Sequence, residues 1–195
     1  METVDRYEKA LAASEDALRL SPEDARAWYR KGVALDDLNR YEEALAAREQ
    51  ELEPNSGSAK TRGRENVAPD IVNRYKQALA AYEEALRLDP VYAEAWDKKG
   101  VVLDNLNRCE EALRCLEEAL RLKPDLAEAW DDKGVVVGNL KGDEEALQCF
   151  EEALRLDPNL MPSWYHKGVA LANLGRQKEA EVVETSLRLR FKIFK

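Results

Sequence analysis

The sequence predicts an all-α solenoid in which antiparallel helix pairs stack on one another, each pair being built from 34 residues. The tryptophans lie on a 34-residue grid with one vacant point at Arg62: Trp28, Trp96, Trp130 and Trp164. Alanine keeps the same period without a gap, at Ala10, Ala44, Ala78, Ala112, Ala146 and Ala180. Chains of this kind stack units that contact only their neighbours, and they present extended binding surfaces.

Each repeat is predicted to form a helix, a short turn and a second helix. Residues 93–126 and 127–160 match at 24 of 34 positions, and both halves show the i, i+3, i+4 spacing of amphipathic helices. A proline ends the second helix because it cannot continue it. Gly100 and Ala112 are small enough to let the paired helices approach closely.

The repeat resembles that of the tetratricopeptide repeat family, in the array form common in bacteria and archaea. The family's order of an aromatic residue, a glycine, two alanines and a proline is present as Trp96, Gly100, Ala112, Ala119 and Pro124. The resemblance implies a right-handed superhelical solenoid that binds a protein or peptide partner.

Two departures from the family pattern are regular. A lysine precedes each repeat glycine where the family has leucine, at Lys31, Lys99, Lys133 and Lys167. The tyrosine that opens the second helix is kept at Tyr41 and Tyr75 but is replaced by Cys109, Asp143 and Gln177 further along the chain.

The grid divides the chain into three segments. Residues 1–53 hold a half repeat and the first complete unit, with helices expected near 25–38 and 41–53. Residues 54–72 are a degenerate segment or linker. Residues 73–195 hold the second helix of the degenerate unit, two full units, a final unit and a basic C-terminal tail.

The degenerate segment lacks a recognisable first helix. Arg62 replaces tryptophan and Asn66 replaces glycine, and Pro69 falls inside the expected helix at a cost of roughly 3 kcal/mol. Pro69 instead suits the first turn of a long helix that reaches about Asp89. A missing helix leaves apolar faces uncovered at 41–53 and on this long helix, so the gap collapses, the two blocks separate, or another chain fills it by domain swapping. We therefore expect a homo-oligomer.

Composition argues against several classes of partner. The net charge of −9 repels phosphate backbones, which argues against nucleic acid. No stretch approaches the roughly 20 apolar residues that span a bilayer, and the first residues do not resemble a secretory signal. Three cysteines without a signal sequence favour reduced thiols and a cytoplasmic protein.

The sequence shows no catalytic constellation, so we expect no enzyme activity, no cofactor and no metal. His166 is the single histidine, which argues against histidine-based metal sites and nucleophile–histidine pairs. It shares its repeat position with Arg30, Lys98 and Asp132, so a solvated surface residue is expected. The glycines belong to the repeats or the linker and form no phosphate-binding loop.

The resemblance implies a peptide-binding groove lined by the first helix of each unit. It carries over to one set of residues: Tyr29, Arg30, Val33, Asp97, Lys98, Val101, Asp104, Asn105, Asp131, Asp132, Val135, Asn139, Tyr165, Val169 and Asn173. The valines form an apolar stripe and the middle repeats are acidic. We therefore expect a protein-interaction or scaffold module that binds an extended or helical segment with basic and apolar residues. A carboxylate clamp of the chaperone-tail type needs asparagine where Val33 and Val101 stand, which argues against that ligand.

Two readings of these features stay open. The basic and apolar segment 187–195 either docks the chain to a membrane or a partner, as part of a regulatory or assembly module, or it finishes the last helix. The groove charges either select a ligand or only keep the array in solution.

Overall fold

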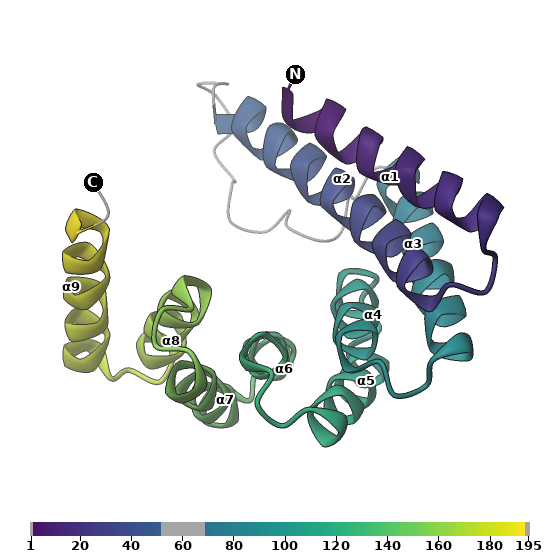
Figure 1. Cartoon of the computed structure of the whole chain (residues 1–195). Helices are drawn as coiled ribbons and strands as arrows, with labels where there is room; N and C mark the ends of the chain where they lie inside the picture. The colour runs from purple at the N-terminus through teal and green to yellow at the C-terminus, as the bar shows by residue number, and fades with distance from the viewer. Residues whose placement is uncertain (1, 52–68, 194–195) are drawn as a thin grey trace. The chain divides into compact units, whose positions relative to one another are not determined.

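The computed structural model describes the backbone of residues 2–51 and 69–193, and side chains within 4–40 and 69–188. All secondary structure within these ranges is helical (Figure 1). The helices are α1 Glu2–Leu20, α2 Ala25–Glu51, α3 Pro69–Leu88, α4 Ala93–Asn105, α5 Cys109–Leu122, α6 Ala127–Asn139, α7 Asp143–Leu156, α8 Met161–Asn173 and α9 Gln177–Ile193. The predicted all-α fold is confirmed. The chain forms two compact units, Met1–Arg108 and Cys109–Lys195, and each is described by itself.

The helix α2 corrects the sequence analysis. It runs without interruption over 27 residues, so the prediction of two helices near 25–38 and 41–53 is wrong. The expected turn lies at Asn39, and the equivalent residue Asn107 has a left-handed φ of 61° between α4 and α5. Asn39 is instead helical and fully buried. The reason lies in the helix with which α2 pairs.

The partner of α2 is α3. A Cβ atom on Gly32 would lie 2.6 Å from the Tyr82 ring, and in the second unit a Cβ on Gly134 would collide with Phe150 in the same way. Glycine and aromatic ring are 16 residues apart in the second unit and 50 apart in the first. The residue 16 positions after Gly32 is Arg48, whose charge cannot take the fully buried place of Tyr82 without a large desolvation cost.

The helix α3 begins at Pro69 and ends at Leu88, so the predicted long helix is confirmed. Proline is tolerated at a first helical position because its missing N–H has no intrahelical role there, and Asp70 adds a favourable charge beside it. α3 packs against both α2 and α4, so the expectation that it lacks a neighbour is wrong. The predicted linker lies largely outside the described residues, as do the side chains of 41–53.

The lysines that replace the family's leucine join successive repeats. Each lysine pairs with a glutamate 16 residues earlier, on the preceding second helix, across Nζ–Oε1 distances of 2.8 to 3.6 Å. The pairs are Lys31–Glu15, Lys99–Glu83, Lys133–Glu117 and Lys167–Glu151. Three of these lysines also lie 5.5 to 5.9 Å from a tryptophan ring centroid. The regular spacing on both sides of the α2–α3 pair shows that this pair occupies one ordinary repeat position.

The tryptophans fix the connection that precedes each first helix. In every repeat the indole Nε1 donates a hydrogen bond of 2.9 to 3.0 Å to the carbonyl oxygen of the proline six residues earlier. The pairs are Trp28–Pro22, Trp96–Pro90, Trp130–Pro124 and Trp164–Pro158. Tryptophan therefore contributes both apolar surface and a specific link between repeats.

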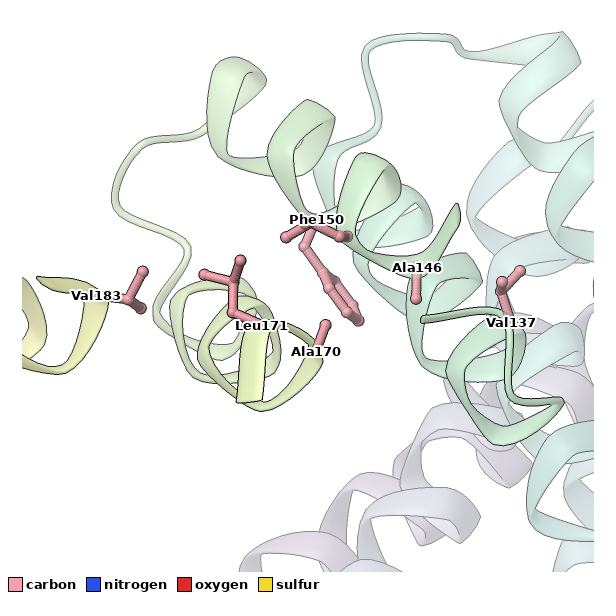
Figure 2. Packing of buried hydrophobic residues seen from close by; sticks show 7 residues of the cluster. Val137, Ala146, Phe150, Ala170, Leu171 and Val183 are labelled. Atoms are coloured by element: carbon pink, nitrogen blue, oxygen red, sulfur yellow. The ribbon is translucent and has the colours of Figure 1, made fainter. Parts of the chain in front are cut away.

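The core of the second unit lies between α6, α7, α8 and α9. Figure 2 shows Phe150 of α7 between the small residues Ala146 and Ala170, with Leu171 and Val183 on the side of Ala170. All are buried. The small residues set how closely the helices approach, and the rings and branched chains fill the space between them.

Candidate functional site

A pocket of about 180 Å³ lies between α6, α7 and α8. We call it the α6–α8 pocket, and its lining residues are Gly134, Val135, Gly138, Asn139, Asp143, Ala146, Phe150, His166, Val169, Ala170 and Asn173. Pockets for drug-sized ligands measure roughly 300–1,000 Å³. The α6–α8 pocket is smaller than this range.

The pocket exists because two repeat positions carry smaller residues than they do in the first unit. Asp143 opens α7 at the position where Tyr75 lies on α3, and the Tyr75 ring is 1% exposed. Gly138 takes the place of the buried Asp36 and Asp104. A large side chain therefore fills the equivalent space in the first unit, and its loss leaves a hollow in the second.

Hydrogen bonds fix the polar groups around the pocket. His166 Nδ1 lies 3.0 and 3.1 Å from the two carboxylate oxygens of Asp131, joining α8 to α6. Asn173 Nδ2 donates to Asp143 Oδ1 at 3.0 Å, joining α8 to α7. The expectation that His166 is a solvated surface residue is wrong: its side chain is 30% exposed and it is held by a buried carboxylate.

Aromatic and apolar groups continue from the pocket onto the surface of α8. The rings of Phe150 and Tyr165 have their centroids 5.4 and 5.7 Å from that of His166. Tyr165 is 64% exposed and Val169 is 43% exposed. Large exposed apolar groups beside a hollow are typical of a surface that contacts another molecule.

The first unit presents a more closely packed surface on α2 and α4. The Tyr29 ring lies 4.9 Å from that of Tyr92 and 6.0 Å from that of Tyr82. Burial raises the pKa of Tyr29 to about 12. Lys98 Nζ lies 2.9 Å from Oδ2 of Asp97, which is buried. Lys98 and Asp97 on this surface are thus already paired with each other.

The predicted groove residues fall into both units. Four of them meet in the α6–α8 pocket: Val135, Asn139, Val169 and Asn173. Asp131 is buried and bonded to His166, Asp132 is half-buried, and Tyr165 is exposed on the adjoining turn of α8. In the first unit Arg30 is exposed, Tyr29, Val33, Lys98, Val101 and Asn105 are half-buried, and Asp97 and Asp104 are buried.

Sequence reasoning missed the part of the pocket that comes from α7. Asp143, Ala146 and Phe150 belong to a second helix, and only first helices were expected to line the groove. The replacement of tyrosine by Asp143 at a position kept as Tyr75 was the available signal.

The described residues contain no cluster of metal-binding side chains. No group of three histidine, cysteine, aspartate or glutamate side chains among them lies close enough to hold a metal ion. Over the same ranges, no helix has the length and apolar content needed to cross a membrane. The segment 187–195 continues α9 as far as Ile193, and Leu187 packs against the core of the second unit. Side chains from 189 onward lie outside the described residues.

Solved structures with the same fold cover nearly the whole chain. MamA from Desulfovibrio magneticus RS-1 is 21% identical with a TM-score of 0.65, covering 93% of this chain and 84% of its own. The pilF protein of Pseudomonas aeruginosa is 21% identical with a TM-score of 0.68, covering 95% and 69%. YrrB, described as a TPR protein with an unusual peptide-binding site, is 24% identical with a TM-score of 0.57, covering 95% and 78%. At these identities the likeness establishes the fold alone.

Comparison with protein-family models shows the family of the chain. No curated protein sequence matches the chain. Models of the tetratricopeptide repeat match residues 4–59, 72–127, 127–160 and 149–182. These matches span well over half of the sequence and agree with the repeat geometry described above. The chain therefore belongs to the tetratricopeptide repeat family.

Proposed function

We propose that this chain is a protein-interaction module that binds a basic and apolar peptide segment, extended or helical, along the first helices of its repeats. Proteins of the tetratricopeptide repeat family mediate interactions with proteins or peptides, and the peptide-binding site of YrrB is one example among similar structures. In this chain the α6–α8 pocket is the proposed anchor point for one apolar side chain of the ligand.

The observation that carries the proposal is the combination of an apolar hollow with the carboxylate of Asp143 at its edge. Val135, Val169 and Phe150 supply apolar surface to the pocket, and Asp143 lies among them. Hydrogen bonds from Asn173 and His166 hold Asp143 and Asp131 in place. An arginine or lysine beside the anchoring side chain would find an acceptor of fixed geometry.

The pocket can be tested by restoring the missing ring. Asp143→Tyr places at α7 the residue that α3 has as Tyr75, and we expect it to fill the pocket and weaken peptide binding by at least about tenfold. Gln177→Tyr is the matched control, because Gln177 has the same repeat position on α9 and does not line the pocket. Binding is measured by fluorescence anisotropy with a labelled octapeptide of alternating leucine and arginine.

Two further peptides separate the contributions of charge and apolar contact. Replacing arginine by glutamate should abolish binding, and replacing leucine by serine should leave only weak, salt-sensitive binding. If Asp143→Tyr binds the leucine–arginine peptide as tightly as the unchanged chain does, the pocket is not the anchor point. If the glutamate peptide binds equally well, the proposed ligand class is wrong.

Self-association belongs to the same proposal, with its contact on α9. Val182 is 66% exposed, whereas the same repeat position is occupied by the exposed polar residues Gln148 and Arg114 in the two preceding second helices. An apolar residue at this position suits contact with another copy of the chain. Light scattering across a concentration range should show an oligomer that Val182→Arg disperses. A monomer at all concentrations would contradict this part of the proposal.

A further inference from the structure

The sequence contains two segments with the pattern of a second helix that could pair with α2. Residues 41–52 and 75–86 share seven of twelve residues when aligned on the repeat grid, including Tyr41 with Tyr75 and Ala44 with Ala78. Only the latter segment, within α3, lies against Gly32. We call the surface of α2 around Gly32 that α3 covers the pairing face. The former segment begins where a second helix begins in every regular repeat.

Two differences between these segments fall at positions where α3 is fully buried. Tyr82 and Ala85 are each 0% exposed. The aligned residues in the earlier segment are Arg48 and Glu51. Burying a charge is costly even when it is paired, so these two residues keep the earlier segment off the pairing face.

The residues that join the pairing face to the earlier segment retain the means to turn. Leu38-Asn39-Arg40 repeats the tripeptide Leu106-Asn107-Arg108, which forms the turn between α4 and α5 with a φ of 61° at its asparagine. The grid residues of the later turns, Lys141 and Gly175, are also left-handed, at 65° and 72°. Asparagine adopts this conformation more readily than most residues.

The buried side chain of Asn39 lacks hydrogen bonds to the described residues when this residue is helical. Its side chain is 0% exposed, and neither its Nδ2 nor its Oδ1 atom finds a hydrogen-bond partner in the described part of the chain. Buried polar atoms without partners are uncommon and mark a local cost. A turn at Asn39 would release this residue from the interior of a continuous helix.

We propose that the pairing face is a site of helix exchange, in which residues 41–53 can fold back at Asn39 and displace α3. Arg48 and Glu51 hold the equilibrium on the side of α3. The two states differ in continuity, because α3 contacts both α2 and α4, and its displacement leaves these two helices only their small direct contact. The occupant of the pairing face therefore decides whether α1 and α2 stay connected to the rest of the first unit.

The test is to exchange the deciding residues. The double variant Arg48→Tyr with Glu51→Ala should move residues 41–53 onto the pairing face. Hydrogen exchange followed by mass spectrometry on the full chain should then show amides of 41–53 exchanging at least about tenfold more slowly and those of 75–88 correspondingly faster. In the unchanged chain the protected segment should be 75–88.

A matched control makes the same number of changes toward the α3 sequence at positions outside the buried face. Glu42→Lys with Glu43→Gln copies Lys76 and Gln77, both exposed on α3. It also raises the identity of the two segments from seven to nine of twelve residues, as the test variant does. This control should leave the protection pattern unchanged, because it places no apolar residue at a buried position.

The possible outcomes decide the proposal. Protection that stays on 75–88 in the folded double variant overturns it. Protection of both segments that rises with protein concentration means that a second copy binds 41–53, which also overturns an exchange within one chain. If the double variant does not fold, adding Tyr82→Arg and Ala85→Glu reverses the two segments completely, and failure of that variant to fold with 41–53 protected rejects the proposal.

Discussion

The helices α2, α3 and α4 of the first unit and α6, α7 and α8 of the second are built on the same frame and differ in what fills it. Both use a glycine against an aromatic ring, and both link successive repeats through tryptophan, proline, lysine and glutamate. At the repeat position of the second-helix tyrosine, Tyr75 is buried within α3 in the first unit, whereas Asp143 at the start of α7 borders a pocket in the second unit. The grid residues therefore set the stacking that the two units share, and the residue at the second-helix tyrosine position accompanies the difference in the pocket.

The largest effect should come from removing the rings that contact the repeat glycines. Tyr82→Ala and Phe150→Ala should each lower the free energy of unfolding by about 3–5 kcal/mol, since both rings are buried. Tyr82→Phe distinguishes the two sites, because the Tyr82 hydroxyl has no hydrogen-bond partner among the described residues. We expect Tyr82→Phe to be neutral or stabilising by about 1 kcal/mol. Urea unfolding measures all three, and a strong loss in Tyr82→Phe would reveal a bond to the hydroxyl.

Replacing the repeat glycines by alanine should change the free energy of unfolding in opposite directions at different repeats. Gly32→Ala and Gly134→Ala force a Cβ atom into an aromatic ring, and we expect destabilisation of about 1–3 kcal/mol. A Cβ atom on Gly168 would have Val183 Cγ1 as its nearest neighbour, at an ordinary contact distance of 3.5 Å. Gly168→Ala should therefore stabilise α8 by about 0.5–1 kcal/mol through helix propensity. Thermal melting followed by circular dichroism tests the ranking, which equal effects at all three sites would contradict.

Alkaline pH should destabilise the first unit before the second. Burial raises the pKa of Tyr29 from 10.0 to about 12 and raises those of Tyr82 and Tyr92. The folded unit therefore retains protons that the unfolded chain releases, so its stability is full below pH 10 and falls as the pH rises toward 12. In the second unit the sequence has only Tyr165, which is 64% exposed.

An alkaline titration checks this difference. Absorbance at about 295 nm reports tyrosinate formation and circular dichroism reports helix loss. Tyr82→Phe removes one of the raised groups, so the midpoint of helix loss should move to higher pH. An unchanged midpoint would show that Tyr82 does not contribute to alkaline unfolding.

The smallest effect should come from the lysines between repeats. Lys133→Leu restores the residue typical of the family and removes both the 3.6 Å contact with Glu117 and the contact with the Trp130 ring. The lysine faces a 59% exposed glutamate, so we expect a change within about 1 kcal/mol. Urea unfolding at low and high salt would separate the ionic part, and a loss well beyond this value would give the lysine a larger structural role.

Much of the fold could be predicted from the sequence because the repeat signals are local. The spacing of tryptophan, glycine, alanine and proline predicted the helix pairs, and Pro69 correctly predicted the start of α3. The break expected inside α2 was wrong because the choice of α3 as its partner depends on buried positions 50 residues apart in the chain. No local pattern around Asn39 distinguishes it from Asn107, which does form a turn.

Less of the candidate site could be predicted from the sequence. The family pattern predicted Val135, Asn139, Val169 and Asn173, which the structure brings together. It did not predict the α7 residues, because a cavity depends on what is missing from three helices at once. His166 was misjudged because its partner Asp131 lies 35 residues away and one repeat earlier.

The offset of 34 residues between the two candidate partners of α2 also has a consequence during protein synthesis. A ribosome adds roughly 5–20 residues per second, so residues 41–53 emerge about 2–7 seconds before 75–88. Helices form within about a microsecond, far faster than this delay. On our proposal, the pairing face of a nascent chain meets the earlier segment first, and Arg48 and Glu51 keep that face open until α3 has been made.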